Sequence, residues 1–141
     1  MTTSTPQPNV SEQQLRELTV AAEKVAANAH APYSSFRVGA ALLLESGEVF
    51  TGCNVENSSF RLTSCAEQVA IGTAVSALGP GIRIRAVVVV NLNGASCSPC
   101  GACRQTLLEF GTPQTLVAFP DKGVVQLSQL HELIPFGFAL Q

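Results

Sequence analysis

Residues 86–90 are Ala-Val-Val-Val-Val, an unbroken run of apolar and mostly β-branched side chains. A strand that is covered on both faces needs apolar side chains in both of its alternating rows. The run therefore predicts a buried strand, and we expect this strand at the centre of the sheet.

Two apolar segments, residues 36–44 and 49–54, precede this run and are joined by Glu-Ser-Gly-Glu at 45–48. Short connections that contain glycine are typical of hairpins, so the two segments should pair antiparallel. Further strands are expected at 115–119 and near 124–126.

Ser11 suits the N-cap of a helix whose apolar residues recur at helical spacing to about His30, just before Pro32. Because strands and helices alternate after the hairpin, crossovers between parallel strands should extend the sheet. The sequence thus predicts an α/β fold, a mixed sheet of about five strands with helices on both faces. The other expected helices lie at 65–78, from 99 or 100 to 110, and in a last turn at 128–133.

The 141-residue chain has the size of one domain, which we place at residues 11–141. Charged residues make up 13% of it, well below the ~25% that is usual. Because so few charges cover a small surface, we expect other subunits to cover part of that surface. The net charge of -2 and the lack of a Lys or Arg stripe argue against long nucleic acids as partners.

The first nine residues, MTTSTPQPN, lack the basic and apolar regions of a secretion signal. No apolar stretch approaches the roughly 20 residues of a membrane span. We therefore expect a disordered tail at 1–10 on a cytoplasmic protein with no membrane partner. The five cysteines are odd in number, so metal or thiol chemistry explains them better than disulfide bonds.

Three of these cysteines stand where helices should begin. In the segment 98–103, Ser-Pro-Cys-Gly-Ala-Cys, we expect Ser98 as the N-cap and Pro99 as the first helical residue. Cys100 and Cys103 then share one face of the first turn, and Cys65 opens the helix expected at 65–78. Helix N-termini favour thiolates, and three thiolates leave Zn²⁺ with one open position, as catalytic zinc sites do.

The charges of such a site do not balance, because three thiolates exceed the charge of one Zn²⁺ and should make its water less acidic. The two helix N-termini can offset this surplus, and Arg104 is the nearest obvious cation. We therefore place Arg104 in the surroundings of the metal, with an ordinary surface arginine as the alternative.

Glu67 has two interpretations. Ser64-x-x-Glu67 has the spacing of a capping box, in which the carboxylate would only cap the helix. A carboxylate two residues after a metal ligand can instead face the open site and transfer protons. Cys97 extends the second motif to C-x-x-C-x-x-C, which also suggests an iron–sulfur cluster, but no fourth cysteine is near. For Cys97 and Cys53 we favour small buried or bystander thiols.

Cys65-Ala66-Glu67, followed by the Pro-Cys-Gly-Ala-Cys of 99–103, resembles the signature of the zinc nucleobase deaminases, with cysteine where some members have histidine. The chain is most similar to the homotetrameric cytidine deaminases. The similarity covers nearly everything after the tail. Its stretches are APYSSFRVGAAL at 31–42, GCNVEN at 52–57, SPCGACRQ at 98–105 and ELIPFGF at 132–138.

The resemblance implies a three-layer α/β/α subunit that hydrolyses cytidine and deoxycytidine to uridine and deoxyuridine with release of ammonia, as in pyrimidine salvage. Glu67 would transfer protons from water to N3 of the base and to the leaving amino group. Active sites would be shared between the chains of a homotetramer. The implied substrate contacts are Asn54 and Glu56 to the ribose hydroxyls, Phe36 to the pyrimidine, backbone at Ala66 and Cys100 to the base edge, and Phe60 and Phe138 near a neighbouring subunit's site.

Two positions depart from the usual family pattern. Gln68 stands where arginine usually follows Cys-Ala-Glu, and Phe60-Arg61 stands where Tyr-Gly is common. The arginine is thought to offset the thiolate charge, so Gln68 leaves that charge less compensated. Gln68 can still donate hydrogen bonds to sulfur, and Arg61 is a second candidate cation.

Three other functions are compatible with parts of this pattern. A deaminase of the same fold could act on another cytosine compound, such as a nucleoside antibiotic like blasticidin S. A structural zinc or redox module would show a fourth protein ligand or a Cys100–Cys103 disulfide. A protein that edits RNA or DNA fits poorly with the acidic balance.

Overall fold

A computed structural model describes residues 10–140 of the chain. The elements in chain order are α1 (Glu12–Ala26), β1 (Val38–Leu44), β2 (Val49–Cys53), the 3₁₀ turn η1 (Phe60–Leu62), α2 (Ala66–Leu78), β3 (Ile84–Asn91), α3 (Gly101–Phe110), β4 (Leu116–Asp121), β5 (Val124–Gln129) and α4 (Leu130–Leu133). The sheet has the strand order β2-β1-β3-β4-β5, with β3 in the middle as the valine run predicts. β1 and β2 form the expected antiparallel hairpin, and β3 and β4 are parallel.

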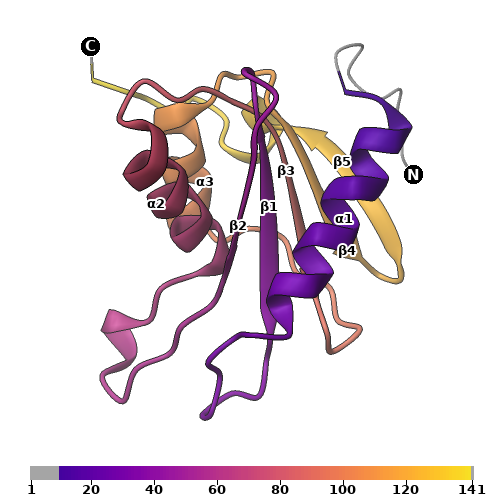
Figure 1. Cartoon of the computed structure of the whole chain (residues 1–141), viewed down its shortest axis with the longest axis vertical. Helices are drawn as coiled ribbons and strands as arrows, with labels where there is room; N and C mark the ends of the chain where they lie inside the picture. Colours follow the sequence, from indigo (N-terminus) through magenta and orange to yellow (C-terminus); the bar gives the residue numbers. More distant parts are fainter. Residues whose placement is uncertain (1–9, 141) are drawn as a thin grey trace.

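The helices cover the two faces of the sheet unequally. α1 lies on one face, while α2 and α3 lie side by side on the other (Figure 1). Side chains along β3 alternate between these layers. Val87 and Val89 pack in the core on the α2 and α3 side, whereas Ala86 and Val88 pack against α1. The predicted α/β fold and the implied three-layer α/β/α arrangement are confirmed.

Two glycines let the helices approach the sheet closely. A Cβ atom built on Gly39 in β1 would lie 2.0 Å from the carbonyl oxygen of Ala22 in α1. A Cβ atom on Gly52 in β2 would lie 2.3 Å from the backbone nitrogen of Ala70 in α2. Backbone atoms cannot yield to such contacts, so Gly52 sets the height of α2 over the sheet, and with it the position of the N-terminus of α2.

Some boundaries differ from those expected. Ser11 caps α1 in a capping box, as predicted, but α1 ends at Ala26 and not near His30. His30 instead forms a bridge with Val55, which draws the chain out of the helix. β5 extends to Gln129 because it pairs with β4 along its whole length, so α4 starts later than expected.

The predicted tail at 1–10 lies outside the described residues, except for Val10, whose side chain is buried in the core on the α1 side. Within residues 10–140, no helix has the length and apolar character needed to cross a membrane.

Candidate active site

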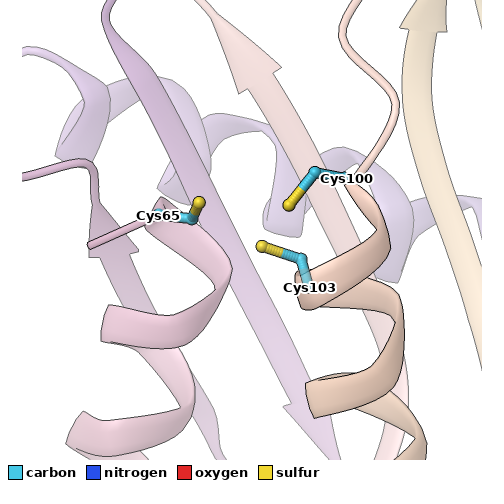
Figure 2. A group of neighbouring side chains, drawn as sticks. All are labelled: Cys65, Cys100 and Cys103. Carbon is cyan, nitrogen blue, oxygen red and sulfur yellow. The ribbon is translucent and has the colours of Figure 1, made fainter. Parts of the chain in front are cut away.

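The three cysteines predicted as metal ligands meet in one cluster. Cys65 lies at the start of α2, and Cys100 and Cys103 lie at the start of α3, with their side chains turned toward one another (Figure 2). Their three Sγ atoms all lie within 4.8 Å of one another. Thiolates bound about 2.3 Å from a tetrahedral zinc are roughly 3.8 Å apart, so the cluster has the size and the donor chemistry for Zn²⁺.

Helices α2 and α3 start one or two residues later than the sequence predicts. Cys100, and not Ser98, is the N-cap of α3, and Cys65 is the N-cap of α2. Neither cysteine sulfur caps its own helix, so both are free to face the cluster. The unpaired N–H groups of two helix ends therefore converge on the thiols, where they favour negative charge.

This shift of the α2 start decides between the two interpretations of Glu67. Because Cys65 is the N-cap, Ser64 lies outside the helix, and the capping box expected as the alternative is absent from α2. Glu67 is instead 4% exposed and lines the same pocket as the three cysteines. Burial of the carboxyl group raises its pKa above the ordinary value. A buried carboxyl group with a raised pKa can both take up and give back a proton.

The thiols of the cluster differ in acidity. A hydrogen bond with Cys103 lowers the pKa of Cys65 to about 7, and the same bond raises the pKa of Cys103. One thiol thus holds the proton that stabilises the other as a thiolate, and a metal ion would take the place of that proton.

Cys97 behaves differently from the three clustered cysteines. Burial raises its pKa to about 11, and its sulfur is not part of the cluster. Its side chain does line the pocket wall. All five cysteines are free thiols, and within residues 10–140 the cluster has three ligands and no fourth. These features favour an open metal site over a structural or redox one.

The pocket at the cluster, about 220 Å³ in volume, brings most of the implied substrate contacts together. A second hollow adjoins it and shares Thr63, a residue that the sequence did not single out. The first is lined by Phe36, Val38, Asn54, Thr63, Cys65, Ala66, Glu67, Cys97, Ser98, Cys100 and Cys103. The second is lined by Tyr33, Ser34, Glu56, Phe60 and Thr63.

Two polar residues, Asn54 in the first hollow and Glu56 in the second, are held by backbone groups of residues 33–38. The Asn54 side chain accepts from Val38 N at 2.9 Å and donates to Phe36 O at 2.8 Å. Oε1 of Glu56 accepts from the backbone N–H groups of Tyr33 and Ser34, at 3.0 and 3.2 Å. Both side chains therefore have set orientations.

Phe138 is the one implied contact that the structure does not bring to either hollow. Its side chain is 68% exposed, and its carbonyl oxygen accepts a hydrogen bond from Gln105 in α3. The residue follows α4 and faces solvent within its own chain.

Arg104, the nearest candidate cation, binds backbone carbonyl groups. Arg104 donates to the carbonyl oxygens of Pro99, at 2.7 Å, and Leu133, at 2.8 Å, so it fastens the loop before α3 to the end of α4. Arg61 is exposed on η1. Among the hydrogen bonds of the described residues, none joins Gln68 to a cluster sulfur. The N-termini of α2 and α3 lie at the cluster, where they can offset thiolate charge.

Comparisons with known proteins agree with this geometry. The model of the cytidine and deoxycytidylate deaminase zinc-binding region matches residues 12–119. A probable cytidine deaminase of Dictyostelium discoideum is 42% identical over 130 residues, covering 92% of this chain and 87% of that protein. A cytidine deaminase of Mycobacterium tuberculosis is 45% identical over 119 residues, or 84% and 85% of the two chains. The crystal structure of the Burkholderia pseudomallei cytidine deaminase superimposes with a TM-score of 0.79 at 42% identity, covering 87% of this chain and 98% of that one.

Proposed function

The chain belongs to the family of cytidine and deoxycytidylate deaminases, and we propose that it hydrolyses cytidine and deoxycytidine to uridine and deoxyuridine, with release of ammonia, in pyrimidine salvage. The observation that carries this proposal is the burial of Glu67 in one pocket with three clustered thiols. The residues 11–141 form the deaminase domain in this proposal.

Zn²⁺ is the cofactor, and Cys65, Cys100 and Cys103 are the residues that would hold it. When bound, zinc supplies a Lewis acid with one open position, at which water becomes a nucleophile near neutral pH. The chain contributes two helix N-termini behind the thiols, which stabilise the deprotonated ligands.

Glu67 moves the protons of the reaction. Its carboxylate takes a proton from the attacking water and delivers it to N3 of the cytosine ring, which makes C4 more electrophilic. It then takes the proton of the new C4 hydroxyl group and transfers it to the amino group, so that ammonia leaves as the C4 carbonyl forms. A raised pKa suits both tasks, because an acid–base group works best when its pKa is near the working pH.

The remaining pocket residues bind the nucleoside. The Phe36 ring is available to pack against the pyrimidine, and backbone groups at Ala66 and Cys100 lie where the base edge would meet the helix starts. Asn54 keeps one N–H that no backbone group uses, and Glu56 keeps an acceptor position on Oε2. These two groups would bind the ribose hydroxyls.

A nucleoside should be preferred over a nucleotide. None of the described residues that line the two hollows is a lysine or arginine, and Glu56 adds negative charge there. A 5′-phosphate would therefore lack a cationic partner. In a spectrophotometric assay we expect kcat/KM for cytidine and deoxycytidine to exceed that for cytidine 5′-monophosphate by roughly 100-fold, or more. Equal or faster turnover of the monophosphate would contradict the assignment.

We also propose a homotetramer with shared active sites. Phe60 and Phe138 are 74% and 68% exposed, and large exposed aromatics are typical of surfaces that a partner covers. Low charge content supports the same conclusion. In sedimentation experiments the active enzyme should have four times the mass of the 14.7 kDa chain. An active monomer would refute this proposal.

A further inference from the structure

Ser34 lines the second hollow and forms hydrogen bonds with two residues of the proposed substrate site. Its hydroxyl group donates a hydrogen bond to Oε2 of Glu56 and accepts one from Phe36 N at 3.0 Å. The Ser34 side chain thus links Glu56, which we propose binds the sugar, to the backbone of Phe36, which we propose packs against the base. The roles proposed for the zinc cluster and for Glu67 do not involve Ser34.

The hydrogen bonds of Glu56 all come from one turn. Two backbone N–H groups of residues 33 and 34 bind Oε1, while the Ser34 hydroxyl group binds Oε2. A carboxylate has about four acceptor positions, so these three donors leave one position, on Oε2. The Ser34 hydroxyl group decides which side of Oε2 that free position faces.

The same hydroxyl group also affects the charge of Glu56. Its hydrogen bond is the largest cause that lowers the pKa of the Glu56 carboxyl group, ahead of the backbone N–H groups. Glu56 is therefore held as an acceptor, ready for a sugar hydroxyl group that donates.

The alternative is that Ser34 only stabilises the turn, since serine hydroxyl groups often form hydrogen bonds with the backbone two residues further along the chain. The bond to Phe36 N fits that interpretation. The bond to Glu56 does not, because it spans 22 residues of sequence and ends on a side chain. The two interpretations differ in whether the effect of Ser34 depends on the sugar hydroxyls.

We propose that Ser34 is a positioning residue for nucleoside binding, whose hydroxyl group orients the Glu56 carboxylate toward the ribose hydroxyls. This inference rests on the proposed function, in which Glu56 binds the sugar. Ser34 does not touch the reacting atoms, so its effect falls on binding and not on the chemical step.

The test compares Ser34→Ala with the wild type on cytidine. We expect KM to rise roughly 10-fold with kcat changed by less than about 2-fold, as for the loss of binding that substrate and transition state share. Ser34→Thr, which keeps the hydroxyl group, should restore most of the affinity. Ser46→Ala is the matched control, because Ser46 donates to Glu48 at 3.0 Å in the exposed hairpin turn, away from the site. Its kinetics should be those of the wild type.

A second substrate separates positioning from general damage. 2′,3′-Dideoxycytidine lacks the 2′ and 3′ hydroxyl groups of the sugar, to which we assign the contact with Glu56, so on this substrate Ser34→Ala and the wild type should have KM values within about 2-fold of each other. A rise in KM that persists with the dideoxy substrate, or an unchanged KM for cytidine, overturns the inference while cytidine turnover by the wild type upholds the function. No cytidine turnover by the wild type would overturn both.

Discussion

Glu67→Gln is expected to fold, to bind zinc as the wild type does, and to lose nearly all turnover of cytidine. Glu67 is 4% exposed in the pocket of the metal cluster, and burial already favours its uncharged form. The neutral amide has nearly the same shape as a protonated carboxyl group, so the fold should tolerate it. The amide cannot take up a proton, and the loss of acid–base catalysis should lower kcat by about 10³- to 10⁴-fold.

Steady-state assays of kcat, with zinc content and thermal unfolding as companions, check this prediction. Glu109→Gln is a suitable control, because Glu109 is exposed on α3 and outside both hollows. Full activity in Glu67→Gln would show that another group transfers the protons. A variant that has lost zinc as well would instead place Glu67 in the metal site.

The sheet could be predicted from sequence because its signals are local. The valine run has apolar side chains in both rows, and the hairpin is set by a four-residue turn at 45–48. Both patterns can be recognised without knowing which elements pack against the strands. The meeting of Cys65 with the second pair of cysteines could be inferred only from the chemistry of the three residues. The sequence does not show how α2 and α3 pack.

The helix starts were harder to predict, because several residues compete for one cap. Ser98 and Ser64 are both good N-cap residues, yet Cys100 and Cys65 occupy the caps. A shift of one or two residues changes the fold little, but it decides whether Glu67 caps the helix or lines the pocket. With Cys65 as the N-cap the carboxylate has no capping role and faces the pocket.

Long-range hydrogen bonds could not be predicted at all. Arg104 was expected in the surroundings of the metal, and its position in the sequence did not show that its guanidinium group would bind two backbone segments, one of them 29 residues away. Ser34 and Thr63 carried no signal of their own, since small polar residues are common in loops. Only the folded chain places them against Glu56 and between the two hollows.

Cytidine turnover should depend on zinc held by Cys65, Cys100 and Cys103. The direct measurement is the loss of cytidine absorbance on adding enzyme, repeated after zinc is removed by a chelator and again after Zn²⁺ is restored. We expect activity to be abolished without zinc and recovered with one zinc per chain, and Cys53→Ala, outside the cluster, to behave as the wild type. Undiminished turnover by the zinc-free protein would contradict a zinc-dependent deamination.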